Sequence, residues 1–208
     1  MRRCVIITAY IQTSIRDTLA LDPTDLLLCA DGGYVAAHTE GLQPDAILGD
    51  FDSMPALPLP SCIDVQHFPR EKDETDTFLC IQYGVAHGCD AFVCVGGMGG
   101  RLDHTYANLQ LLQWGLLHGY SIILADGVER VHLLGRGSLS IERAPDTVLS
   151  LFAYSPTCRI SVTGVQYPLH EYPLTHQFPL GVSNRIVAEK AELCCTEGQL
   201  LVMRLREA

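Results

Sequence analysis

The chain has 208 residues, of which 48% are hydrophobic and 18% charged, a composition typical of a globular protein and not of a disordered one. Its formal net charge is -10, and no basic cluster is visible, which argues against nucleic-acid binding. No apolar run approaches membrane-spanning length, and Met1-Arg2-Arg3 leads into a stretch without signal-peptide character. Most of the nine cysteines lie in apolar runs, as small buried hydrophobes do in a reducing compartment. We therefore expect a cytoplasmic protein that binds neither nucleic acid nor a membrane.

Up to about residue 127, short apolar runs alternate with helical patterns. Several runs are continuously apolar, as in parallel strands that are covered on both faces. The predicted strands are 4–10, 25–31, 45–49, 64–68, 91–96 and 121–126. Helices are predicted over 74–87 and 102–118, and each is followed by a glycine. The second helix carries an apolar stripe of Leu102, Tyr106, Leu109, Leu112 and Leu116. This alternation predicts an α/β fold.

After Gly127 the helical periodicity disappears, and short β-like runs are separated by glycine and proline. The predicted strands are 129–134, 137–143, 147–154, 158–165, 185–195 and 199–205. This pattern is typical of an antiparallel sandwich or barrel. We predict two domains: an N-terminal parallel-sheet nucleotide-binding domain over 1–127 and a C-terminal all-β sandwich over 128–208.

Polar and glycine-rich segments follow three of the predicted strands. They are 31–33 (DGG), 49–53 (GDFDS) and 96–101 (GGMGGR). Ligands of parallel sheets bind beyond the carboxyl ends of the strands, so these segments are expected to share one edge. A merely solvated acidic surface would not follow this rule.

The aspartates of these segments suit a divalent cation. Asp50 and Asp52 are two residues apart, which places both carboxylates on one side of an extended chain. Oxygen ligands without histidine or cysteine favour Mg²⁺. Asp73 and Asp76 lie three apart at a predicted helix start. Asp73 or Thr75 could instead cap that helix, with Asp76 favoured by the helix dipole, and both interpretations stay open.

Three features suit phosphate. Lys72 is one of only two lysines and lies beside an aspartate pair, which favours neutralisation of phosphate charge. The glycines of 96–100 precede a helix, where backbone N–H groups and the positive end of the helix attract anions, although the segment matches no standard nucleotide motif. Arg101 is a candidate phosphate clamp. Together with the carboxylates, these residues predict a nucleotide phosphoryl-transfer site.

One face of the second helix adds polar candidates. His104 and Asn108 are an i, i+4 pair. His104 could bind a metal or act as a base, but a hydrogen bond that positions substrate or structure is the preferred interpretation. Asp103, in the first turn, could cap the helix or reach the substrate.

Four segments together resemble the thiamine pyrophosphokinase (thiamine diphosphokinase) family. They are ADGGYVAAHTEGLQPDAILGDFDS (30–53), EKDETDTFLC (71–80), GGMGGRLDHTYANLQLL (96–112) and GVSN (181–184). The resemblance implies an N-terminal α/β domain for ATP and a C-terminal sandwich that contributes to the thiamine site. It also implies a homodimer that binds thiamine between subunits.

The resemblance assigns roles residue by residue. It places Mg²⁺ and phosphate at Asp50, Asp52, Asp73 and Asp76, with Lys72 and Arg101 as phosphate contacts. It matches Asp31 to the aspartate of the family's ADGG turn, and together with the glycine loop and helix residues discussed above we expect nucleotide binding at Asp31, Gly97, Gly99, Gly100, Arg101 and Asn108. Thiamine binding is assigned to Asp103, Tyr167, Ser183 and Asn184. Tyr167 would stack on the thiamine ring, and the alternative is a core aromatic of the sandwich. The segment 8–12 (TAYIQ) departs from the family pattern, so no nucleotide contact is assigned to it.

The expected reaction moves the βγ-diphosphate of ATP to the hydroxyethyl oxygen of thiamine and releases AMP. Lys72 and Arg101 would hold the phosphates, and one of the aspartates is the candidate general base. One alternative is a pyrophosphokinase for another alcohol, such as a hydroxymethylpterin. Another is a non-catalytic sensor of nucleotide or thiamine.

Overall fold

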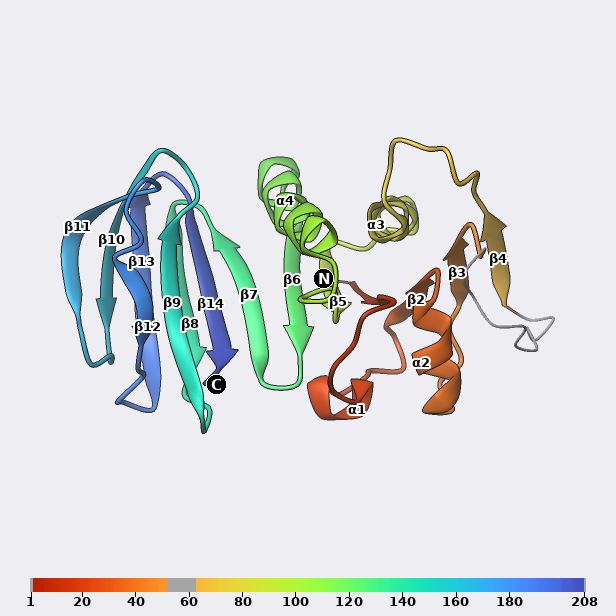
Figure 1. Ribbon diagram of the computed structural model, residues 1–208, viewed down its shortest axis with the longest axis horizontal. Helices are drawn as coiled ribbons and strands as arrows, with labels where there is room; N and C mark the ends of the chain where they lie inside the picture. Colours follow the sequence, from red (N-terminus) through yellow and green to blue (C-terminus); the bar gives the residue numbers. More distant parts are fainter. Residues whose placement is uncertain (1, 52–62, 208) are drawn as a thin grey trace. The chain divides into compact units, whose positions relative to one another are not determined.

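The computed structural model describes residues 2–51 and 63–207. The chain divides into two compact units, Met1–Gly127 and Val128–Ala208. The first contains a parallel sheet with the strand order β6-β5-β1-β2-β3-β4 (Figure 1). Its strands are β1 (Arg3–Ile7), β2 (Leu26–Ala30), β3 (Ala46–Gly49), β4 (Asp64–His67), β5 (Ala91–Val95) and β6 (Ser121–Asp126). Every residue of β2 and of β3 is buried, which confirms the interpretation of their continuous apolar runs.

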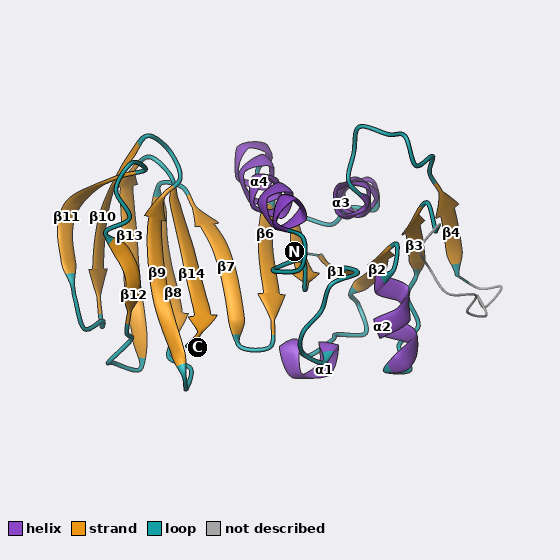
Figure 2. Ribbon diagram, in the orientation of Figure 1, coloured by secondary structure: helices purple, strands orange, loops and turns teal. Residues whose placement is uncertain are grey.

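Helices cover both faces of this sheet (Figures 1 and 2). The short helices α1 (Ile15–Thr18) and α2 (Gly33–Thr39) lie on one face, and the predicted helices α3 (Asp76–Ala86) and α4 (Leu102–His118) lie on the other. The helix α4 ends as predicted at Gly119, which has a φ of 80°. The first unit is therefore a doubly wound α/β layer structure.

The apolar stripe predicted on α4 is wrong at its beginning. Leu102 is 82% exposed and Tyr106 is 60% exposed, whereas the buried face carries Asn108, Leu112 and Gly115. Gly115 explains the rotation, because a Cβ at this position would lie 2.6 Å from Cδ1 of Ile122 in β6. The helix approaches the sheet most closely there, so the residues one and two turns before Gly115 also face inward.

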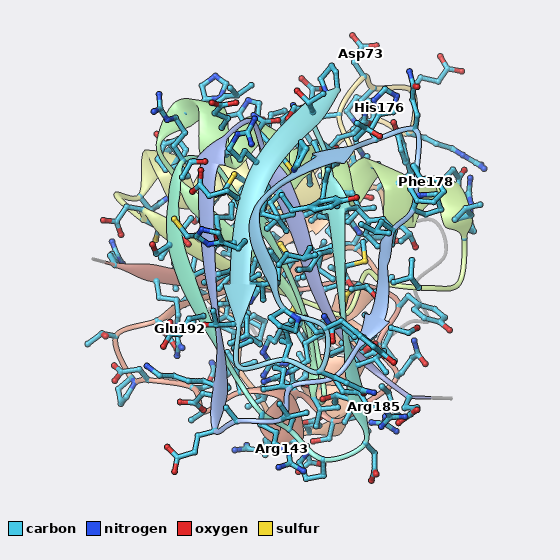
Figure 3. The ribbon with its side chains drawn as sticks, turned by 90° about the vertical axis from the view of Figure 1, so that its left-hand side faces the viewer. Asp73, Arg143, His176, Phe178, Arg185 and Glu192 are labelled. Atoms are coloured by element: carbon cyan, nitrogen blue, oxygen red, sulfur yellow. The ribbon has the colours of Figure 1, made fainter. Side chains whose placement is uncertain are left out.

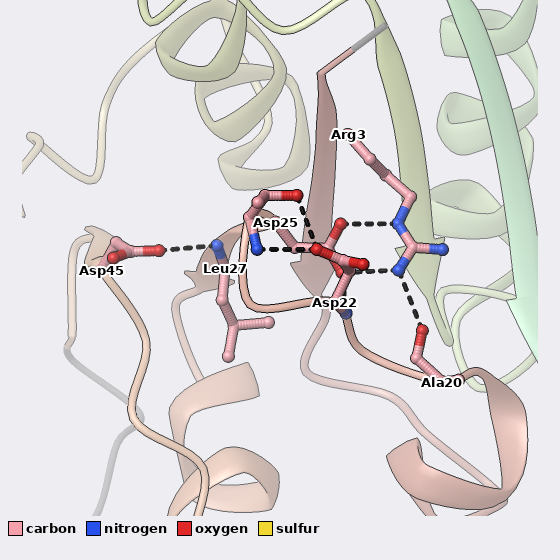
Figure 4. Close-up of polar contacts among 7 residues, drawn as sticks. Arg3, Ala20, Asp22, Asp25, Leu27 and Asp45 are labelled. Atoms are coloured by element: carbon pink, nitrogen blue, oxygen red, sulfur yellow. Dashed lines mark hydrogen bonds and ion pairs between the residues drawn. The ribbon is translucent and has the colours of Figure 1, made fainter.

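Carboxylates at the amino edge of the sheet, where the parallel strands begin, have structural partners (Figure 4). Asp25 accepts hydrogen bonds from Nε of Arg3 at 2.8 Å and from the backbone N–H of Asp22 at 2.7 Å. Asp45 accepts one from the backbone N–H of Leu27 at 2.8 Å. Part of the acidity of the N-terminal region is therefore structural and lies opposite the predicted site.

The second unit consists of two antiparallel sheets with the strand orders β12-β9-β14-β7 and β11-β10-β13-β8 (Figures 1 and 3). The strands are β7 (Glu129–Leu134), β8 (Gly137–Glu142), β9 (Thr147–Ala153), β10 (Thr157–Thr163), β11 (Leu169–Thr175), β12 (Gly181–Asn184), β13 (Lys190–Glu197) and β14 (Leu200–Arg206). Buried residues of both sheets, such as Leu149 and Leu151 from one and Ile160 and Leu193 from the other, form one core. The predicted sandwich is confirmed.

Two strands of the second unit were not predicted. β11 contains Pro173, and a proline within a run argues against predicting a strand there. β12 is only four residues long. The strand predicted over 185–195 is wrong at its start, because β13 begins at Lys190 and Ile186 forms only an isolated bridge with Val165.

The cysteines behave as small core residues in the described part of the chain. The eight cysteines there are all free, and seven are buried. Burial raises the pKa of the Cys94 thiol to about 12, so it stays protonated at neutral pH. Within the described ranges, no helix is long and apolar enough to cross a membrane.

We expect Asp25→Asn to lower the free energy of unfolding by about 2 kcal/mol, because it leaves the guanidinium of Arg3 without its carboxylate. The Asp25 side chain is only 5% exposed, but that of Arg3 is 33% exposed, so solvent screening keeps the loss below that of a fully buried pair. Urea unfolding at pH 7 measures the change. A loss below about 0.5 kcal/mol would show that this pair has no structural role.

Candidate functional site

A pocket of about 830 Å³ lies at the carboxyl edge of the parallel sheet in the first unit. The chain adds β2, β3 and β4 on one side of β1 and then β5 and β6 on the other, so the strand order reverses in space between β1 and β5. Ligands of doubly wound sheets bind at such a switch point. The pocket lining includes many residues that the sequence assigned to the site, namely Asp31, Asp50, Lys72, Asp73, Asp76, Gly97, Gly99, Gly100, Arg101 and Asn108.

Asp31 joins the ends of two strands at the pocket. It follows β2 with a φ of 45°, and its Oδ1 accepts a hydrogen bond from the backbone N–H of Phe51 at 3.1 Å. Gly49 allows this approach, because a Cβ there would lie 2.9 Å from the Cβ of Asp31. Asp50, between Gly49 and Phe51, is thereby held at the lining, whereas Asp52 lies outside the described residues.

Lys72 and Asp76 form an ion pair, with Nζ and Oδ1 2.8 Å apart. Their side chains are 12% and 29% exposed, so the pair is largely shielded from water. Among the described residues, the Lys72 ammonium is the only partner of Asp76 Oδ1, which forms no hydrogen bond of regular geometry. Thr75 caps α3 by accepting a hydrogen bond from Phe78 N–H, so the alternative of Asp73 as the cap is wrong. Asp73 is exposed at the lining.

The carboxylates of the pocket fit the chemistry of Mg²⁺ but do not form a complete site. No three His, Cys, Asp or Glu side chains of residues 2–51 and 63–207 could together hold a metal ion. Asp50 and Asp73 nevertheless present oxygen donors to one pocket. Mg²⁺ commonly uses one or two carboxylates and completes its coordination with water and substrate phosphates.

The glycine loop, residues 96–100, has the backbone that its composition predicts, but its N–H groups are mostly used within the protein. Gly96, Gly97, Gly99 and Gly100 have φ values of 80°, 71°, 102° and 65°. Gly96 N–H donates to Ala125 O at 2.7 Å, Gly97 N–H to Tyr10 O at 2.8 Å and Gly99 N–H to Thr105 Oγ1 at 3.0 Å.

The prediction that this whole loop cradles phosphate is therefore wrong. Among the described residues, none accepts a hydrogen bond from the N–H groups of Gly100 and Arg101, which immediately precede α4. Gly100 and Arg101 also line the pocket, so an anion site is favoured at this end of the loop, where the dipole of α4 attracts negative charge.

Polar side chains near the start of α4 hold the glycine loop and one another. Asn108 is 5% exposed, and its Nδ2 donates to Gly97 O at 2.9 Å, so it supports the loop. Arg101 Nη2 lies 2.6 Å from Asp103 Oδ2, and both side chains are exposed. Their hydrogen bond raises the pKa of Arg101 and lowers that of Asp103. His104 lines the pocket beside them.

The sequence interpretation missed part of the lining. Thr8, Ala9 and Tyr10 lie in it, although no contact was assigned to this segment, and Arg70 adds a further cation. The strand predicted over 4–10 ends at Ile7, which leaves the next residues free to form a turn at the pocket. The signal available was their position directly after a parallel strand.

In the second unit, hydrogen bonds hold the backbone of two predicted substrate residues, Tyr167 and Ser183, and the side chain of Asn184 holds the first of them. Its Oδ1 accepts a hydrogen bond from Tyr167 N–H at 3.1 Å, and its Nδ2 donates to Tyr167 O at 2.9 Å. Ser183, with a φ of 57°, donates its N–H to Ser150 Oγ at 3.1 Å. Tyr167 is 63% exposed, so its interpretation as a core aromatic is wrong.

These contacts predict different effects on stability. Tyr167→Ala should change the free energy of unfolding by less than about 0.5 kcal/mol, because the ring is exposed. Asn184→Ala should lower it by about 2 kcal/mol, because it removes both bonds to the Tyr167 backbone at a site that is only 8% exposed. Thermal and urea unfolding of the two variants test this. Equal losses would contradict the assignment of the structural role to Asn184.

Comparison with known proteins identifies the family. Residues 18–124 match the sequence model of the thiamin pyrophosphokinase catalytic domain, and residues 138–200 match that of its vitamin B1 binding domain. The chain is 27% identical over 189 residues to a thiamine pyrophosphokinase of Bacillus subtilis, with 88% of each chain covered. The fold is similar to solved structures of thiamine pyrophosphokinases from Bacillus subtilis (TM-score 0.85, 24% identity, 100% of both chains) and Candida albicans (0.74, 16%, 98% of this chain and 89% of that one). The chain therefore belongs to the thiamine pyrophosphokinase family.

Proposed function

We propose that this chain is an ATP-dependent thiamine pyrophosphokinase of the cytoplasm, which transfers a diphosphate from ATP to thiamine and releases AMP. The observation that carries the proposal is the pocket at the β1/β5 switch point. It gathers carboxylates, Lys72 and the start of α4 within the segment that matches the catalytic-domain model. The match of residues 138–200 to a vitamin B1 binding domain favours thiamine over a pterin as the acceptor.

In this mechanism, the hydroxyl oxygen of thiamine forms a bond to the β-phosphorus of ATP. The bond from that phosphorus to the oxygen bridging the α- and β-phosphates breaks, and AMP leaves with this oxygen. An aspartate of the pocket accepts the hydroxyl proton. The protein mainly positions the reactants and offsets charge, because phosphoryl transfer leaves it little covalent chemistry.

Individual residues divide this work. Lys72 would neutralise phosphate charge, and the 2.8 Å contact with Asp76 orients its ammonium. The N–H groups of Gly100 and Arg101 would bind phosphate oxygens at the start of α4. Asp50 and Asp73, with Asp52 outside the described residues, would hold Mg²⁺. When bound, this ion would neutralise negative charge on the phosphates.

An assay of AMP release with three acceptor conditions tests the function. Purified protein receives ATP and Mg²⁺ with thiamine, with a hydroxymethylpterin or with no acceptor. We expect AMP with thiamine alone, and none after EDTA is added. Release with the pterin alone would support the other pyrophosphokinase, and no release under any condition would support a sensor. Wild-type rates in EDTA would contradict the Mg²⁺ proposal.

Two substitutions should separate phosphate handling from thiamine binding. Lys72→Ala should lower kcat by about 10²- to 10³-fold, with thiamine binding by calorimetry unchanged. The matched control is Lys190→Ala, since the other lysine is half exposed and paired with Glu192 at 2.6 Å. Tyr167→Ala should raise the KM for thiamine roughly 5- to 150-fold through lost stacking, while Tyr167→Phe should preserve it.

Two outcomes would contradict these assigned roles. A Tyr167→Ala variant with an unchanged thiamine KM removes the stacking proposal. A Lys190→Ala variant as impaired as Lys72→Ala would show that loss of positive charge, wherever it occurs, explains the effect.

We also propose a homodimer with thiamine bound between subunits. Its support is the family and the exposed apolar side chains, which include Leu102 in the first unit and Phe178 in the second (Figure 3). Light scattering at micromolar concentration should give twice the chain mass of 22.8 kDa. A fully active species with the mass of a single chain would overturn the proposal.

A further inference from the structure

A buried carboxylate without an assigned role lies at the end of β6. Asp126 is only 2% exposed. Its Oδ2 accepts a hydrogen bond from Gln12 N–H and its Oδ1 one from Thr13 N–H, both at 2.8 Å. Each carboxylate oxygen thus fixes one backbone amide of the segment that leads from β1 to α1. Charge-assisted hydrogen bonds of this kind are among the stronger ones in proteins.

The segment held by Asp126 in turn contacts the glycine loop. Tyr10 O accepts the hydrogen bond from Gly97 N–H at 2.8 Å, and Gln12 Nε2 donates to Met98 O at 3.2 Å. The Tyr10 ring packs on the next residues of the loop, because Cβ atoms at Gly99 and Gly100 would lie 2.9 and 2.7 Å from its carbons. The β1–α1 segment therefore supports the loop along most of its length.

The loop that this segment supports includes the N–H groups available to bind a ligand. Tyr10, Gly97, Gly99 and Gly100 all line the pocket, and Gly100 N–H has no acceptor among the described residues. A displacement of the β1–α1 segment would therefore move the groups that face the ligand. Asp25, the buried carboxylate at the amino edge, contacts Arg3, Asp22 and no lining residue of this pocket among its hydrogen bonds to described residues.

We propose that Asp126 is a positioning residue for the nucleotide phosphates. It fixes Gln12 and Thr13, these hold Tyr10 against the glycine loop, and the loop presents Gly100 and Arg101 N–H to the ligand. This inference rests on the proposed function, because it names ATP as the ligand of that end of the pocket. Displacements of about 1 Å in such a site can cost about 10²-fold in rate, so loss of the anchor should be visible in kinetics.

The test compares Asp126→Asn with Asp25→Asn, since both variants keep the side-chain shape and remove a buried charge. In Asp126→Asn the new NH₂ group faces a backbone N–H that it cannot accept from. Hydrogen exchange of the nucleotide-free protein should become faster at Gly97 and Gly99 in Asp126→Asn and stay unchanged there in Asp25→Asn. Asp126→Asn should also raise the KM for ATP at least about 10-fold, with the KM for thiamine within about twofold of wild type.

A second variant keeps the test decisive if Asp126→Asn does not fold. Gln12→Leu removes the bond to Met98 O without altering a charge, and it should shift exchange and the KM for ATP in the same direction by a smaller factor. Unchanged exchange at Gly97 in Asp126→Asn, or in Gln12→Leu when only that variant folds, overturns the proposal. So does a KM for ATP that changes equally in Asp126→Asn and Asp25→Asn.

Failure of the proposed function gives a different result. A wild-type protein that releases no AMP with thiamine overturns the assigned reaction. Exchange of the nucleotide-free protein then still decides whether Asp126 positions the loop, because that measurement needs no substrate.

Discussion

The location of the candidate site depends on the strand order of the parallel sheet. β1 has β2 on one side and β5 on the other. Because β1 and β5 are parallel, the connections that follow them leave the same edge of the sheet. They lead to α1 and α4, which cover opposite faces (Figure 1). This divergence forms a pocket at the switch point, and every other segment of the site follows a neighbouring strand to the same edge.

Much of the fold could be predicted because burial on both faces leaves a simple signal. The continuous apolar run that became β2 indicated a strand covered on both faces, and every residue of β2 is buried. The signal fails where tertiary contacts override local pattern. The face of α4 is set by the close approach of Gly115 to Ile122, which no periodicity within α4 reveals. β11 was missed because Pro173 is a poor strand residue, although an edge strand tolerates it.

The sequence predicted which residues line the candidate site better than it predicted which hydrogen bonds they form. Position after a parallel strand was enough to select Asp50 and the glycine loop. Sequence does not show which donors are already used, so the N–H groups of Gly97 and Gly99 were wrongly assigned to phosphate. Asp126 carries no motif at all, and its role follows only from contacts between segments more than 100 residues apart.

The most direct test of this account is a crystal structure with Mg²⁺, thiamine and a non-hydrolysable ATP analogue. The account predicts phosphate oxygens within about 3 Å of Gly100 N–H and of Lys72 Nζ, with the thiamine hydroxyl facing the β-phosphorus. A nucleotide bound away from the β1/β5 switch point, or phosphates held without contact to Lys72 and the start of α4, would contradict it.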